Sequence, residues 1–282
     1  MSALAQRRTP RVAITFDLEM SRNFPTWETT HWDYEKGNLD EGAKRYSVEV
    51  ARRVKAAGGR MHFFLVGRVL EHESVAWLDE IKAMGHAIGN HTYDHVNVLA
   101  RKAEDVQFRF RRAPWLMGGR SVPDVLADNI ALTTQAMRQR LGIAPAGFRT
   151  PGGFAEGLTG RPDVQKMLQA QGFEWVSSKY TRGIEQCQPF HYPETGLLEI
   201  PMCPVSDINA FRTERWPLER FLDETRKGVE WALANGGVFD LLAHPSCLGV
   251  VDPGFRVVDM ICARAQSATL TDVANDFAKS RV

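Results

Sequence analysis

The sequence predicts an α/β fold with a parallel sheet and helices outside it. Two observations support this. Short apolar runs alternate with longer helical stretches along the 282 residues, as in folds that place helices around a parallel sheet. The residues able to act in catalysis or metal binding fall where the apolar runs end. The carboxyl ends of strands are where parallel barrels place their active sites. No internal repeat interrupts the pattern, so we expect one domain.

Each element follows from its own pattern. Strands are predicted where short apolar runs are closed by turn residues or acids, at 11–16, 61–66, 86–89, 146–148, 173–177, 197–201 and 238–243. Helices are predicted where longer periodic stretches lie between them, several ended by glycine, at 42–57, 75–84, 122–141, 161–171, 217–234, 256–265 and 272–280.

Composition narrows the class of protein. Apolar residues make up 44% of the chain and charged residues 24%, which is ordinary for a protein with a buried core. The net charge of +1 gives no electrostatic reason to expect nucleic acid or a membrane as a partner. The cysteines show no C-x-x-C spacing, which argues against a zinc cage. No secretory signal or membrane span is recognised, so a cytoplasmic location is expected.

Two histidines and two acids carry the first chemical signal. His91 and His95 lie four residues apart, and side chains at that spacing share a face on one helical turn. Asp17 and Glu19 end the first predicted strand, where residues i and i+2 point the same way. Two imidazoles and a carboxylate can hold a divalent metal and leave positions open for water and substrate. This favours a metal-dependent hydrolase.

With these residues laid out, the chain resembles the polysaccharide deacetylase family, whose domains are also described as NodB-homology or carbohydrate esterase family 4-like. The resemblance runs from about Arg11 to about Phe277 and rests on motifs in the family's order. They are Thr15-Phe16-Asp17-Leu18-Glu19, Phe63-Phe64-Leu65-Val66-Gly67, His91-Thr92-Tyr93-Asp94-His95, Phe148-Arg149-Thr150-Pro151-Gly152-Gly153, Leu198-Glu199-Ile200-Pro201 and Leu241-Leu242-Ala243-His244-Pro245.

The resemblance implies a fold and a reaction. The fold would be a single distorted β/α barrel of the glycoside hydrolase/deacetylase type, with about seven parallel strands, spanning 1–282 with a core at about 11–277. The reaction would be hydrolysis of a non-peptide C–N bond, first of all the removal of an acetyl group from an acetylated amino sugar or polysaccharide. The implied cofactor is a divalent metal, with zinc first and other first-row metals as alternatives. Carbohydrate or a small amide is the implied substrate.

The roles implied by the resemblance are specific. The metal ligands are Glu19, His91 and His95. Asp17 is the catalytic base, Arg149 orients it and His244 is the acid.

Two departures from the family pattern leave alternatives open. The usual pair of adjacent aspartates is Asp17-Leu18 here, so the swapped roles for Asp17 and Glu19 remain a second assignment. The aspartate that commonly supports the late histidine has no obvious counterpart, and Asp207 is the replacement we consider.

Two segments are interpreted as loop insertions, at 20–41 and 108–122. The first carries Trp27 and Trp32, which we assign to substrate binding together with Pro151 and Gly152, because long loops often bind ligands and glycine allows close backbone approach. The second carries Trp115-Leu116-Met117, which suggests a lid or a contact in a homo-oligomer.

Three rival functions remain at this point. An amidohydrolase acting on a small cyclic amide or ureide, as an allantoinase or imidase does, would use the same barrel and suits a protein without an export signal. A catalytically weak carbohydrate-binding barrel would explain the two departures. An iron oxygenase with two histidines and one carboxylate is permitted by ligand type, but the β/α alternation and the motifs around Arg149 and His244 argue against it.

Overall fold

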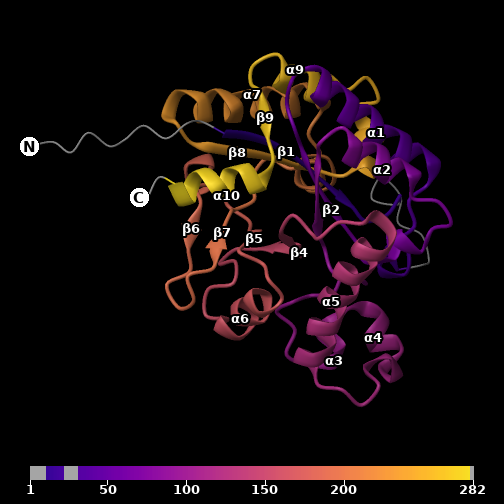
Figure 1. The fold of residues 1–282 in the computed structure, drawn as a ribbon. Helices are drawn as coiled ribbons and strands as arrows, with labels where there is room; N and C mark the ends of the chain where they lie inside the picture. Colours follow the sequence, from indigo (N-terminus) through magenta and orange to yellow (C-terminus); the bar gives the residue numbers. More distant parts are fainter. Residues whose placement is uncertain (1–10, 22–30, 280–282) are drawn as a thin grey trace, which may run out of the picture.

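A curled, mostly parallel sheet forms the centre of the computed structural model, which describes residues 11–21 and 31–279 (Figure 1). The strand order is β6-β7-β5-β4-β3-β2-β1-β8, and β9 pairs with β1. The strands are β1 (Arg11–Leu18), β2 (His62–Leu65), β3 (Ala87–Asn90), β4 (Phe148–Phe154), β5 (Trp175–Lys179), β6 (Phe190–His191), β7 (Leu198–Glu199), β8 (Val238–Ala243) and β9 (Ser267–Ala268). The predicted α/β barrel is confirmed, as a half-barrel with outer helices.

Two features make the barrel incomplete. β6 pairs antiparallel with β7, whereas the other described ladders are parallel. No ladder joins β6 to β8 within the described ranges, although a single bridge links Ser206 to Leu242. The sheet therefore curls without closing into a complete barrel.

β1 is the central strand for function. All of its residues after Arg11 are buried, because it runs between β2 and β8. The register places Asp17 opposite Phe64 of β2 and Phe16 opposite Ala243 of β8. The acidic end of β1 and His244, which follows β8, are thereby brought to the same edge of the sheet.

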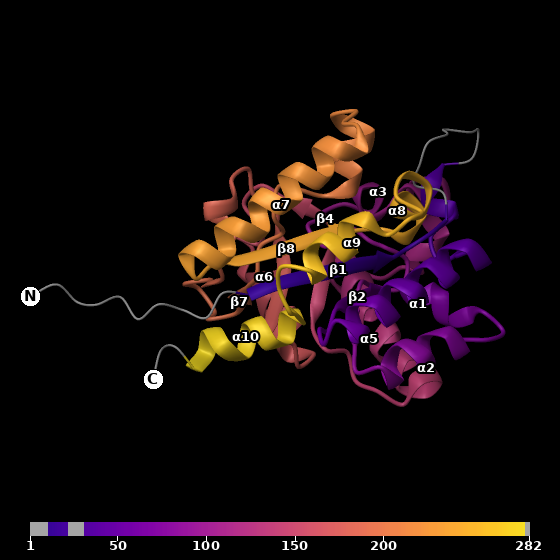
Figure 2. The same cartoon turned by 90° about the horizontal axis from the view of Figure 1, so that it is seen from above.

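Helices cover the outside of this sheet (Figure 2). Several begin and end with the signals that their sequences predict. The Asp40 side chain accepts a hydrogen bond from Ala43 N at the start of α1, and Ser121 does the same for α5. The α-helices are α1 (Glu41–Ala56), α2 (Ala76–Ala83), α3 (Ala103–Val106), α4 (Phe108–Arg112), α5 (Val122–Leu141), α6 (Pro162–Ala170), α7 (Leu218–Asn235), α8 (Pro245–Val251), α9 (Arg256–Cys262) and α10 (Leu270–Lys279). No helix among the described residues is long and apolar enough to span a membrane.

One glycine fixes how β4 enters the sheet. Gly147 has a φ of 140°, and a Cβ atom there would lie 2.0 Å from the Trp175 ring. Only glycine fits this close approach without displacing the indole. The tight packing of Trp175 against Gly147 sets the position from which β4 carries Arg149 into the barrel.

Three segments differ from the sequence-based expectation. β4 continues through Phe154, beyond the strand predicted at 146–148. α8 follows His244 directly and was not predicted. The 108–122 segment is not an extended loop, since it contains α4 and a 3-10 helix at Pro114–Met117 that bury Phe110 and Met117. Trp115 of this segment is 74% exposed.

Candidate metal centre

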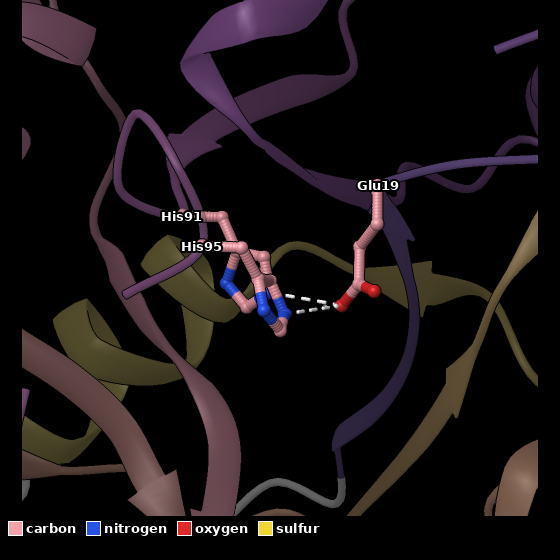
Figure 3. A group of neighbouring side chains, drawn as sticks. All are labelled: Glu19, His91 and His95. Atoms are coloured by element: carbon pink, nitrogen blue, oxygen red, sulfur yellow. Dashed lines mark hydrogen bonds and ion pairs between the residues drawn. The ribbon is translucent and has the colours of Figure 1, made fainter. Parts of the chain in front are cut away.

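Glu19 and the two histidines meet at the carboxyl end of β1. Glu19 Oε1 lies 3.1 Å from His91 Nε2 and 3.0 Å from His95 Nε2. Both imidazoles extend from one loop toward a single carboxylate oxygen on the other side (Figure 3). Glu19 and His91 are buried and His95 is nearly so. Asp17 lies farther from this point, with Oδ2 3.8 Å from His91 Nε2.

The histidines do not lie on a helix, contrary to the sequence-based expectation. Thr92 and His95 have φ values of 60° and 62°, and such left-handed residues interrupt helical hydrogen bonding. The loop is held by side chains instead. Asn90 Oδ1 accepts from Thr92 N at 2.8 Å, and Asn129 Oδ1 accepts from Asp94 N at 2.8 Å. Backbone strain, stabilised by these amide caps, brings the two rings together.

The donor set fits a divalent cation. His91 Nδ1 lies 2.9 Å from the carbonyl oxygen of Arg149, and because a carbonyl only accepts, Nδ1 carries the proton. The neutral ring then directs the lone pair of Nε2 toward Glu19 Oε1, which is also an acceptor. Two acceptors 3.1 Å apart are stabilised by a positive charge shared between them. A carboxylate with two imidazoles is a common ligand set for zinc.

The pKa shifts agree with this ligand set. Burial disfavours the charged form of His95 and lowers its pKa to about 4, although Glu19 opposes the shift. Burial would raise the pKa of Glu19, but the neighbouring His95, Lys36, His244 and His91 outweigh burial and hold that pKa well below its usual value. A neutral imidazole beside an ionised carboxylate is the protonation state that metal ligation needs.

Arg149 joins two carboxylates beside the candidate metal site. Its Nη1 lies 3.0 Å from Asp17 Oδ1 and 2.8 Å from Thr15 Oγ1, and its Nη2 lies 2.7 Å from Asp240 Oδ2. Arg149 and Asp240 are completely buried. The guanidinium therefore has two charge-assisted contacts that fix its plane, and it holds Asp17 at the edge of the site.

His244 has an acidic partner after all. Asp207 Oδ1 lies 2.9 Å from His244 Nδ1, and Asp207 Oδ2 accepts from the backbone N of His244 at 2.6 Å. Burial opposes the charged imidazolium, but Asp207 and then Glu19 raise the pKa of His244 well above its usual value. Nε2 of this ring lies 3.6 Å from Glu19 Oε1. A protonated His244 is suited to donate a proton and not to bind a metal.

Sequence reasoning missed Thr15, Asp240 and Lys36. The first two could have been found from the period of two along strands, because Thr15 shares a face with Asp17, and Asp240 lies four residues before His244. Lys36 comes from the loop between β1 and α1 and forms an ion pair with Glu19 Oε2. No local pattern in the sequence marks this lysine.

A cavity of about 270 Å³ opens beside Glu19 and His95. Of the residues expected to bind substrate, Trp32 and Gly152 line it, whereas Pro151 is buried and does not. Trp27 lies outside the described residues. The rest of the wall is largely apolar and includes Tyr180, Met202, Ile208 and Leu242. The described part of the site thus offers a cavity, partly open to solvent, next to the expected base and acid.

Comparison with protein families finds one matching family model. Residues 37–173 match the family model described as polysaccharide deacetylase. The chain is similar to the polysaccharide deacetylase family over this range, which is just under half of its length. The matched range contains His91, His95 and Arg149, whereas Glu19 and His244 lie outside it and are brought to the same site by the fold. Comparison with curated proteins finds no match.

Solved structures share the fold of this chain at low sequence identity. A structure from Mycobacterium smegmatis described as a polysaccharide deacetylase is 16% identical with a TM-score of 0.67, covering 100% of this chain and 94% of the other. The Puue allantoinase is 13% identical with the same TM-score, at 98% and 92% coverage. A pseudoenzyme of carbohydrate esterase family 4 from Bacillus anthracis is 15% identical with a TM-score of 0.54, at 96% and 67% coverage.

Proposed function

We propose that the protein is a metal-dependent hydrolase of a non-peptide C–N bond, with zinc as its metal. The observation that carries this proposal is the convergence of Glu19, His91 and His95 on one point, 3.0–3.1 Å between donor atoms. The expected base, Asp17, and the expected acid, His244, flank that point. This arrangement favours Glu19 over Asp17 as the third ligand, because Asp17 faces Arg149 instead.

The residues divide the reaction between them. A divalent metal held by Glu19, His91 and His95 would polarise the amide oxygen and lower the pKa of water. Asp17 takes the proton of the attacking water, and Arg149 keeps this carboxylate oriented. His244 gives its proton to the departing amine, and Asp207 keeps the ring charged and directed into the site. The pairs Asp17–Arg149 and His244–Asp207 favour a catalytic function over a barrel that only binds carbohydrate.

The cavity supports a compact substrate. A cavity of about 270 Å³ that is partly open to solvent has room for one sugar ring or a small cyclic amide. The acetamide of an N-acetylated amino sugar is the first candidate, because residues 37–173 match the polysaccharide deacetylase family. A small cyclic amide or ureide is the second candidate, favoured by the apolar wall of Met202, Ile208 and Leu242 and by the fold shared with an allantoinase.

A substrate panel with the zinc-loaded protein tests this proposal. It should contain an N-acetylated monosaccharide, its linear tetramer and a cyclic ureide, with release of acetate or ring opening as the readout. We expect turnover of a single-ring compound to exceed that of the tetramer, and none with His91→Ala, which loses a ligand. His191→Ala, outside the site, is the matched control and should keep wild-type activity. Turnover that is undiminished after complete metal removal would contradict the proposal.

A further inference from the structure

Lys36 is a buried cation at the proposed metal centre. Its side chain is 1% exposed, and its Nζ forms an ion pair with Glu19 Oε2. The same Nζ lies 3.4 Å from His95 Nε2 and 5.2 Å from the centre of the Trp32 ring. The ammonium therefore contacts two of the three residues that the proposed function assigns to the metal.

The backbone next to Lys36 is hydrogen-bonded to the backbone of Glu19. Gly37 N donates to the carbonyl oxygen of Glu19 at 2.6 Å, and His72 Nε2 lies 2.8 Å from the carbonyl oxygen of Gly37. Gly37 has a φ of 95°, and a Cβ there would lie 2.4 Å from Arg68 Cβ. A close-packed turn that only glycine can form thus holds Lys36 in place. The fold itself therefore fixes the position of Lys36.

The ligand atoms of this site cannot bind the ammonium group of Lys36 and a metal ion equally well. The lone pair of His95 Nε2 can point at an ammonium hydrogen or at a metal, but not at both. Glu19 divides its oxygens, with Oε1 toward the imidazoles and Oε2 toward Lys36. A divalent cation bound at Oε1 would lie within a few ångströms of the ammonium, where like charges in a buried site repel strongly.

We propose that Lys36 is an internal competitor of the metal, an ammonium group that holds Glu19 and His95 until a divalent cation displaces it. The inference rests on the proposed metal site. Metal binding then moves the ammonium away from His95, toward the cavity that Lys36 already lines. Lys36 weakens the affinity of the site for metal, so that the occupied fraction responds to the metal concentration.

Zinc affinity of the metal-free full chain tests this inference. A chelator competition should compare wild type with Lys36→Met, which keeps an apolar stem without charge, and with Lys36→Arg, which keeps the charge. We expect Lys36→Met to bind zinc at least about tenfold more tightly, because the repulsion and the competing hydrogen bond are both removed. Lys36→Arg should stay close to wild type. A folded Lys36→Met that binds zinc as wild type does, or more weakly, overturns the proposal.

A labelling experiment on the unmutated chain covers the case in which the variants do not fold. Amine acetylation followed by mass spectrometry should find Lys36 protected in the metal-free protein and labelled several times faster with zinc. Lys227, which is 56% exposed, is the control and should not change. Unchanged labelling of Lys36 in zinc-loaded protein refutes the displacement. Zinc-loaded wild type without any turnover would instead contradict the proposed function and leave the Lys36 result standing.

Discussion

Two buried glutamates at strand ends, Glu19 and Glu199, differ in what surrounds them. Glu199 Oε1 accepts from Ser178 N at 2.7 Å and Lys179 N at 2.8 Å, and its Oε2 accepts from Ser178 Oγ and Tyr192 Oη, both at 2.6 Å. Both oxygens are therefore satisfied by hydrogen-bond donors of the chain itself. Such a carboxyl group ties strands together.

Glu19 has the opposite surroundings. Its Oε1 faces three imidazole nitrogens, from His91, His95 and His244, and its Oε2 faces a buried ammonium. No backbone N–H donates to either oxygen among the hydrogen bonds of the described residues. Burial alone therefore does not mark a functional carboxylate. The two carboxylates differ in what surrounds their oxygens. Hydrogen-bond donors of the fold surround the oxygens of Glu199, whereas groups able to share an external cation surround those of Glu19.

The largest effect on turnover without metal loss is expected at Asp17, which lies two residues before Glu19. Asp17→Asn removes the base but leaves the metal ligands, so kcat should fall by roughly 10²–10⁴ with zinc content unchanged. Elemental analysis and rate measurement on one sample provide the check. Zinc lost from Asp17→Asn and kept in Glu19→Gln would reverse the assignment of base and ligand.

How far the sequence predicts this site depends on the kind of contact. The alternation of apolar runs predicts β1, β8 and the helices between strands, and α5 and β8 are found at their predicted bounds. The spacing of Asp17 and Glu19 also predicts a shared face, because strand geometry is local. The loop of His91 and His95 was wrongly expected to be helical, since its shape depends on Asn129, a residue of α5 far along the chain.

Lys36 and Asp207 show the same limit. Lys36 lies in the irregular segment between β1 and α1, and Asp207 caps the π-helix Ile208–Thr213. Each meets its partner only when the fold brings distant segments together. Asp207, which the sequence offered as a replacement for the missing aspartate, supports His244 across 37 positions of sequence. Contacts between loops are set by the whole fold and leave no periodic signal.

A smaller effect on kcat is expected from substitution of Asp207. This substitution tests the contrast between the charged and neutral imidazoles around Glu19. Asp207 raises the pKa of His244, so the proton donor stays charged above the usual histidine range, and activity is lost as pH rises through that raised pKa. Asp207→Asn should lower this pKa and move the alkaline limb of the kcat profile to lower pH. An alkaline limb that stays in place would show that another group is the acid.

The paired substitutions Glu19→Gln and Glu199→Gln, each assayed for zinc binding by calorimetry on the metal-free chain, test the central claim most directly. We expect one zinc per chain in wild type and in Glu199→Gln, because Glu199 is engaged by the fold alone. Loss of its charged hydrogen bonds should lower the free energy of unfolding by about 1–3 kcal/mol without changing the stoichiometry. Glu19→Gln should fold and bind no zinc at the same concentrations. Zinc binding by Glu19→Gln with wild-type affinity would contradict the account.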